Sequence, residues 1–171
     1  MYSNIHEYIP AHFHPSSRVW IYQSDRKFSD REQTEINEKL NVFASQWKSH
    51  GDQVQGFGKL LYGMFIILMA DETVAGVSGC STDSSVKLIK EIEQAYQVNL
   101  FDRQSLCFVV NHELTTIPLS HFEASIQNEK LTSYTLYFNN LVLTKQELLS
   151  NWVIPVKDSW LKGRMKIRAE R

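Results

Sequence analysis

Apolar residues along this chain recur with two different periods, and each period predicts a different element. Between residues 30 and 49 they return every three or four positions, which is the spacing of one helix face. Ser29 and Glu32 form a capping-box pattern at the start, and Gly51 stands where a C-terminal glycine is expected. The predicted buried face consists of Ile36, Leu40, Phe43, Ala44 and Trp47.

A second helical pattern covers residues 84–98, the stretch SSVKLIKEIEQAYQV. Val86, Ile89, Ile92 and Tyr96 share one face, while lysine and glutamate side chains occupy the other. Two shorter helices are expected further on. They cover residues 118–129, with Pro118 in the first turn, and residues 145–152, with Thr144 as the cap.

The other apolar segments have the β-branched and aromatic composition of strands. RVWIYQS (18–24), SLCFVVN (105–111) and TSYTLYFNNLVL (132–143) are expected strands or strand pairs. The run KLLYGMFIILMA (59–70) is continuously apolar, which predicts one central strand, and TVAGVSG (73–79) is its expected hairpin partner. Together the patterns predict an α+β fold with a mixed sheet of about five strands and three to four helices packed on it.

The length of 171 residues is that of one domain with a substantial core. We therefore expect residues 1–171 to form a single domain. Residues 1–16 are expected to be irregular, and the basic segment 162–171 is expected to be a frayed tail, since it holds five Lys or Arg and one Glu.

Charge and cysteine content narrow the possible partners and the compartment. Eighteen basic and nineteen acidic residues give a net charge of -1, which gives no general reason to bind a nucleic acid. The longest apolar run, residues 64–70, is too short to span a membrane. Cys80 and Cys107 form no C-x-x-C motif, so a reduced, cytoplasmic protein is expected, without a disulfide framework or an indicated cofactor.

The most informative stretch is AGVSGCSTDSSVK, residues 75–87, where small and hydroxyl-bearing residues precede the second helix. Free amide groups and the positive end of the helix dipole favour a phosphate or a carboxylate at such a position. The predicted ligand-binding residues are Ser78, Gly79, Ser81, Thr82, Asp83, Ser84 and Ser85, with Arg103 as an additional positive charge.

Cys80 lies inside this stretch and is the candidate nucleophile, because helix amides lower the pKa of a nearby thiol. The alternative is structural: a capped helix, with Cys80 as a small buried filler. Named motifs do not decide the question. The G-x-S-x-G pattern fails because Cys80 stands at its last position, and the Walker A pattern fails around Gly58 and Lys59.

Metal chemistry is a weaker alternative. Asp25, Asp71 and Glu113 each follow an expected strand, and strand-end carboxylates that converge can hold Mg²⁺ for phosphodiester cleavage. The histidines lack a recognisable ligand motif. His12 and His14, like His112 and His121, are interpreted as surface or capping residues, although His112 beside Glu113 is kept as a possible base for Cys80.

The aromatic C-terminal region suggests a function of another class. Trp152 and Trp160 lie where the secondary-structure pattern is ambiguous, so either could cover an apolar patch or contact a partner chain. A non-catalytic interaction module or a homo-oligomer is therefore the main alternative to an anion site. Whether the protein is an enzyme stays open at this point.

The pieces VWIYQSDR, FASQWKSHG, AGVSGCSTDSSVKLIKEIEQAY and NLFDR together resemble a small family of bacterial proteins to which the label ABC transporter ATPase is sometimes attached. The resemblance covers the first two-thirds of the chain, and SGCSTDSSV and LFDR are its most recognisable parts. It implies a shared fold and a shared site in these motifs. Because both the Walker A and the LSGGQ motifs are missing, it does not imply ATPase activity.

Overall fold

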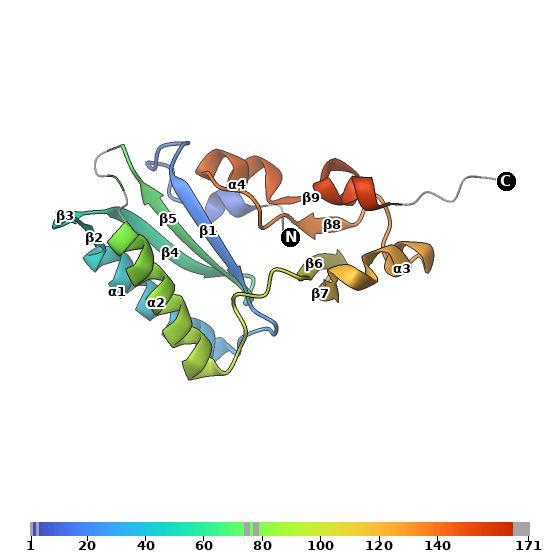
Figure 1. The fold of residues 1–171 in the computed structure, drawn as a ribbon, viewed down its shortest axis with the longest axis horizontal. Coiled ribbons are helices and arrows are strands. Elements are labelled where there is room, and N and C mark those ends of the chain that lie inside the picture. Colours follow the sequence, from blue (N-terminus) through green and yellow to red (C-terminus); the bar gives the residue numbers. More distant parts are fainter. Residues whose placement is uncertain (1, 3, 74–75, 77–78, 166–171) are drawn as a thin grey trace. The chain divides into compact units, whose positions relative to one another are not determined.

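The computed structural model describes residues 2, 4–73, 76 and 79–165, with the side chain of Cys80 excepted. The chain forms two compact units. Unit 1 comprises residues 1–102 and 142–150, and unit 2 comprises residues 103–141 and 151–171. Four α-helices and three antiparallel sheets lie within the described residues, and the α+β class is confirmed (Figure 1).

The main sheet of unit 1 contains β1 (Arg18–Gln23), β5 (Phe65–Asp71) and β4 (Gln55–Leu61) in the order β1-β5-β4. Both pairings are antiparallel. Every residue of β5 is buried, because this strand has a neighbour on each side and covered faces above and below. This explains its uninterrupted apolar sequence.

The expected single strand over residues 59–70 is in fact two strands. Tyr62 and Gly63 adopt positive φ angles of 54° and 69°, which form a tight hairpin turn and place Leu61 opposite Phe65. Because β1 and β4 occupy both edges of β5, the predicted pairing of residues 73–79 with this strand is wrong. Most of the segment 73–79 lies outside the described residues.

Helix α1 (Asp30–Gln46) begins as predicted. The Ser29 side chain accepts a hydrogen bond from the Glu32 amide, and the Glu32 carboxylate accepts one from the Ser29 amide, so the capping box is confirmed. The predicted role of Gly51 is wrong. This glycine and His50 have positive φ and form the turn between β2 (Lys48–Ser49) and β3 (Asp52–Gln53), which are paired strands.

Helix α2 (Gly79–Tyr96) begins five residues before the predicted start. The hydroxyl-bearing residues expected to cap it therefore lie inside its first two turns. It ends at Gln97, whose φ of 52° reverses the chain, and the Val98 amide donates to the Glu93 carbonyl. This is the bond of a Schellman motif, formed here without glycine.

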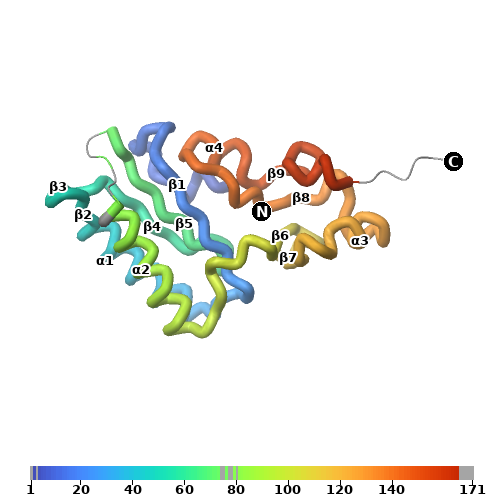
Figure 2. Tube along the Cα trace, in the orientation of Figure 1, coloured from blue at the N-terminus to red at the C-terminus, as the bar shows by residue number. Residues whose placement is uncertain are grey.

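Both long helices pack on the same face of the sheet of unit 1 (Figure 2). Gly56 and Gly58 in β4 allow α1 to approach closely: a Cβ atom at Gly56 would lie 2.8 Å from the Trp47 ring, and one at Gly58 would lie 3.2 Å from the Leu40 Cβ. Helix α2 contributes Ile89 and Ile92 to the same buried cluster.

The opposite face of this sheet is covered by the N-terminal segment, which contains a 3₁₀ helix at Ile5–Glu7. Ile5, Ile9 and Phe13 are buried, and the Phe13 ring contacts that of Phe57 in β4. The apolar side chains of this segment therefore belong to the core.

Two buried polar residues hold the N-terminal segment in place. The Lys145 ammonium, 6% exposed, donates to the carbonyl oxygens of Pro10, Ala11 and Phe13 at 2.7–3.1 Å. The Asp71 carboxylate accepts from the His14 amide at 3.0 Å. Helix α4 (Lys145–Asn151) follows a short segment beside β1, and its predicted Thr144 cap accepts a hydrogen bond from Glu147.

Unit 2 has its own four-stranded antiparallel sheet, in the order β7-β6-β8-β9, and its own apolar core. Asn111 and His112, both with positive φ, form the β6–β7 hairpin turn. The strands thus lie in three antiparallel sheets, whereas the sequence predicted one mixed sheet. The elements of this unit are β6 (Ser105–Val110), β7 (Glu113–Pro118), α3 (Phe122–Gln127), β8 (Leu136–Phe138) and β9 (Val153–Pro155).

Candidate functional site

The predicted anion site lies at the start of α2, and its hydroxyl groups bond within the helix. The Ser84 hydroxyl donates to the Ser81 carbonyl at 2.7 Å, and the Ser85 hydroxyl donates to the Thr82 carbonyl at 2.6 Å. Gly79, Asp83 and Ser84 are exposed, while Ser81 and Ser85 are buried. The Ser84 and Ser85 hydroxyls thus bond to carbonyl groups inside the first turns of α2, whereas the sequence predicted that hydroxyl groups here would cap the helix.

Trp47 packs against this helix start. Its Nε1 group donates a buried hydrogen bond of 3.0 Å to the Ser81 carbonyl, and Ser81 as a whole is only 1% exposed. The Ser81 amide is therefore covered by protein. Ser78 and the Cys80 side chain lie outside the described residues, so the anion site and the thiol chemistry of Cys80 stay predictions.

Arg103, the additional charge expected at this site, belongs to unit 2, where it is exposed just before β6. The predicted base pair His112 and Glu113 also belongs to unit 2, at the β6–β7 turn, whereas Cys80 belongs to unit 1. A site that combines these residues with α2 stays a prediction.

The three strand-end carboxylates are not brought together. Because β1 and β5 are antiparallel, Asp25 and Asp71 follow opposite ends of the paired strands, and Glu113 lies in unit 2. Hydrogen bonds donated by Thr73 and His14 lower the pKa of Asp71, and the Asp25 carboxylate accepts from the Asn99 amide. Across the described residues no three potential ligands among His, Cys, Asp and Glu gather as a metal site would require.

The remaining predicted residues have structural or surface positions. The four histidines singled out in the sequence are exposed, and the His14 ring bonds to the Ser16 hydroxyl. Burial raises the pKa of the Cys107 thiol to about 12, which makes it unreactive. Trp152 is buried in unit 2, so its expected role at a surface is wrong, whereas Trp160 is 41% exposed.

A groove lies between α1 and α2 in unit 1. Its volume is about 750 Å³. Helix α1 contributes Glu35, Glu38, Lys39, Val42, Phe43 and Gln46. Helix α2 contributes Leu88, Glu91, Ile92, Ala95 and Tyr96. These eleven residues define the α1–α2 groove.

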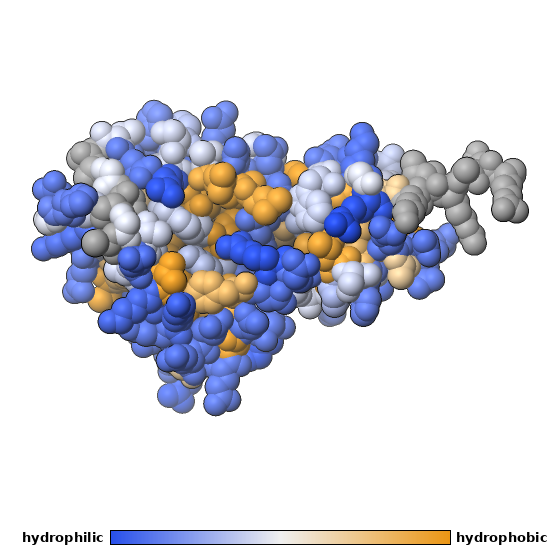
Figure 3. Space-filling view, viewed as in Figure 1, coloured by the Kyte–Doolittle hydropathy of each residue, from blue (hydrophilic) through white to orange (hydrophobic). Residues whose placement is uncertain are grey.

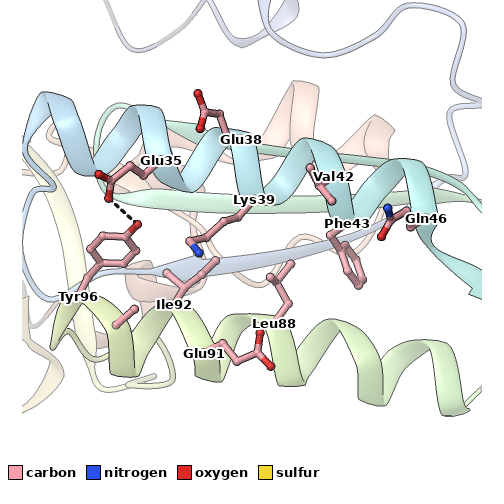
Figure 4. A pocket seen from close by; sticks show the side chains of 11 residues that line it. Glu35, Glu38, Lys39, Val42, Phe43, Gln46, Leu88, Glu91, Ile92 and Tyr96 are labelled. Atoms are coloured by element: carbon pink, nitrogen blue, oxygen red, sulfur yellow. Dashed lines mark hydrogen bonds between the residues drawn. The ribbon is translucent and has the colours of Figure 1, made fainter.

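The close view shows how the two helices line the groove (Figure 4). The Phe43 ring extends from α1 toward α2, where Leu88 projects in return, and the Lys39 side chain extends toward Ile92. One end is closed by the Tyr96 hydroxyl, which donates to the Glu35 carboxylate at 3.0 Å. The groove floor is therefore apolar.

The groove lies above the layer of buried side chains that packs the two helices on the sheet. Leu40 of α1 packs on Gly58, while Ile89 and Ile92 of α2 fill the core between the helices and the sheet. Above that layer Val42 is 55% exposed, and Phe43 and Leu88 are only partly buried. Apolar surface is thus left open along the seam.

The rim of the groove is acidic. The charged residues that line the groove are three glutamates, Glu35, Glu38 and Glu91, and one lysine, Lys39. Glu35 is bonded to Arg31 and to Tyr96, and these hydrogen bonds lower its pKa. Glu38 and Glu91 are exposed, and no ion pair within the described part of the chain engages either of them.

The surface view agrees with this arrangement. Over the region of α1 and α2 it shows mainly hydrophilic residues, with apolar patches among them (Figure 3). Searches of family models, curated proteins and solved structures return no match to this chain. Among the described residues, no helix is both long and apolar enough to cross a membrane. The function must therefore be inferred from the groove itself.

Sequence reasoning missed the groove because it assigned each helix one apolar face and considered the faces separately. Val42 lies beside the predicted face of α1, and Leu88 lies beside that of α2. The available signal was a large aliphatic residue just outside a helix face with a glutamate one helical turn away: Glu38 before Val42, and Glu91 after Leu88. Only the folded structure shows that Val42 of α1 and Leu88 of α2 line the same groove.

Proposed function

We propose that the protein is a non-catalytic interaction module whose α1–α2 groove binds a basic amphipathic segment of a partner protein. The supporting observation is the combination of a half-exposed apolar floor with exposed carboxylates on both rims. An amphipathic helix in such a groove covers the floor with its apolar face, while its basic side chains reach the rims.

The dimensions of the groove suit a short helix. Its α1 wall extends from Glu35 to Gln46, which corresponds to roughly 16 Å along the helix axis. A helical ligand of about 12 residues covers this length and presents two or three apolar anchors at helical spacing. Val42, Phe43 and Leu88 are the residues such anchors would contact.

The rim charges favour a basic ligand over an acidic one. Glu38 and Glu91 lie on opposite helices, so a lysine or arginine on either side of the ligand can approach one of them. These carboxylates are exposed, and their attraction mainly increases the association rate and selects the partner. The apolar floor supplies most of the binding free energy.

Catalysis has less support. The pKa values of Glu32, Glu35 and Asp71 are all lowered by hydrogen bonds donated to the carboxylates, which is the behaviour of structural ion pairs and turns. The buried Cys107 thiol and the half-buried Tyr62 hydroxyl have raised pKa values for lack of solvation. Neither pattern indicates a working acid or base.

The test uses a labelled amphipathic helical peptide of about 12 residues, with leucine anchors and lysines on its polar face. Fluorescence anisotropy should show saturable binding to the full chain. Val42→Asp, which places a charge on the groove floor, should weaken binding at least tenfold, or about 1.4 kcal/mol. The matched control is Leu143→Asp, because Leu143 is 68% exposed in unit 1 and lies outside the groove.

A second peptide carries glutamate in place of lysine and should bind more weakly. Equal binding of both peptides would remove the role of the acidic rim. The proposal would be contradicted if Val42→Asp and Leu143→Asp weakened peptide binding equally. It would also be contradicted if the unmodified chain showed no saturable peptide binding.

A further inference from the structure

The two compact units carry opposite net charges. Unit 1 contains 10 Lys and Arg against 14 Asp and Glu, whereas unit 2 contains 8 against 5. The net charge of the whole chain, -1, is therefore the sum of a net charge of -4 on unit 1 and a net charge of +3 on unit 2. Two copies of such a chain attract each other when the acidic unit of one meets the basic unit of the other.

The positive charge of unit 2 is concentrated at the end of the chain. Residues 162–171 hold five of its eight basic residues and only one acid, Glu170. Apolar Met165, Ile167 and Ala169 alternate with charged residues in this stretch. It thus has the composition that the α1–α2 groove favours, namely apolar anchors flanked by lysine and arginine.

The start of this stretch is fixed in unit 2. Leu161 is fully buried, and the Trp160 Nε1 group donates to the Tyr137 hydroxyl at 3.1 Å. Lys162 and Arg164 are exposed, and residues 166–171 lie outside the described part of the chain. Residues 165–171 span at most roughly 25 Å when extended, which exceeds the length of the groove.

We propose that the α1–α2 groove of one copy binds the basic C-terminal segment, residues 164–171, of a second copy. This inference rests on the proposed function and names its occupant. Ile167 contacts the apolar floor at Phe43 and Leu88, while the flanking basic side chains approach Glu38 and Glu91. Met165 stays packed against the core of its own unit 2.

The resulting contact is heterologous, because groove and tail are different surfaces of the chain. Such contacts close into rings or extend into open chains, according to the rotation between copies. The segment is short and offers one large apolar anchor, Ile167, so association is weak, with a Kd on the order of 100 µM, and it weakens further with salt. Below that concentration the groove is free for another basic partner.

The first experiment is sedimentation of the full chain over a range of concentrations at low and high ionic strength. The sedimentation coefficient should rise with concentration, and less so at high salt. Removal of residues 166–171 should abolish the rise and leave the fold intact, because the buried residues Trp152, Val156 and Leu161 are retained. A monomer at every concentration, or association unaffected by the truncation, would overturn the inference.

The second experiment is a charge exchange. Glu38→Lys with Glu91→Lys should abolish association of the full chain, as should Lys166→Glu with Arg168→Glu in the tail. A mixture of these two double variants should associate again, because the unmodified groove of the tail variant meets the unmodified tail of the groove variant. The charge-exchanged groove and tail are also complementary to each other. Asp30→Lys with Asp52→Lys reverses two exposed carboxylates of unit 1 outside the groove, and these changes should leave association in place.

The outcomes separate the two proposals. Suppose that the lysine-bearing peptide binds the unmodified chain, that Val42→Asp abolishes this binding, and that the full chain stays monomeric. The proposed interaction module is then supported, and binding of the tail of a second copy is wrong. Tail binding that is independent of protein concentration would place the segment in its own groove and also overturn the second-copy inference. If neither the peptide nor the tail binds, both proposals fail.

Discussion

The two faces of the sheet in unit 1 are covered in different ways. On one face the irregular N-terminal segment lies flat on the strands, and its backbone carbonyls are bonded by the buried ammonium of Lys145. On the other face two regular helices cover the strands and leave a groove between them, with Val42 and Leu88 partly exposed. The first face is covered by a segment whose buried carbonyl groups accept hydrogen bonds, while the second leaves apolar surface exposed.

Under the function proposed above, the partner-binding surface lies between two regular helices and not on the irregular segment. Helices are rigid cylinders, so two of them on a flat sheet leave a seam that their side chains fill only in part. An irregular segment can follow the contour of the strands more closely. The N-terminal segment thus has a structural role, and the binding role proposed above falls to the α1–α2 groove.

Two lysines give the largest expected contrast between the faces. Lys145→Met should lower the free energy of unfolding by about 2–4 kcal/mol, because it leaves the carbonyl oxygens of Pro10, Ala11 and Phe13 buried without their donor. Lys39→Met in the groove should change it by less than about 0.5 kcal/mol, since Lys39 is exposed. Urea denaturation of both variants measures the difference, and equal losses would contradict the comparison.

A smaller effect is expected at the start of α1. Hydrogen bonds from Arg26 and from the Ser29 amide lower the pKa of Glu32 to about 2. A carboxylate whose pKa is lowered on folding stabilises the protein above its unfolded pKa, and the contribution is lost as the pH falls toward the folded pKa. The stability of the unmodified chain should therefore decline as the pH falls from about 4.5 to 2.

Glu32→Gln should remove part of this decline, and Glu38→Gln on the groove rim serves as the control. Both glutamates are on α1, but only Glu32 belongs to the capping box and the Arg26 ion pair. Denaturation midpoints measured across the acid range report the result. The same acid dependence in Glu32→Gln and in the unmodified chain would show that this ion pair does not set the local stability.

The last prediction concerns the reactivity of the two cysteines and is expected to leave the fold unchanged. It tests whether the start of α2 lowers the pKa of a nearby thiol. At neutral pH Cys80 should react with iodoacetamide faster than a model thiol, whereas Cys107, whose pKa is about 12, should not react in the folded chain. Mass spectrometry of the labelled chain locates the modification. A Cys80 rate at or below that of the model thiol would end the prediction of thiol chemistry.

Local signals predicted the regular elements well. The capping box of Ser29 and Glu32 and the Thr144 cap are both present, since each depends on residues three positions apart. Strand β1 follows from its β-branched and aromatic composition, and the buried positions Ile36 and Leu40 of α1 follow from periodicity. The predictions failed where one residue type is common in two different local structures. Gly51, for example, could end a helix or turn a hairpin, and only the pairing of β2 with β3 decides between them.

Other features depended on contacts between distant parts of the chain. Tyr62 turns the chain with a positive φ that non-glycine residues rarely adopt, so one apolar run became two strands. Lys145 and its three carbonyl acceptors are more than 130 residues apart, and no local pattern could join them. The candidate groove likewise joins α1 to α2 across residues distant in sequence.

The account depends most on where a basic amphipathic ligand binds. NMR titration of the methyl-labelled chain with the lysine-bearing peptide maps that position directly. We predict saturable shift changes at the methyl groups of Val42, Leu88 and Ile92, with those of Ile5 and Ile9 on the closed face unchanged. No change at the groove methyls, or larger changes at Ile5 and Ile9, would contradict the assignment of the α1–α2 groove as the binding surface.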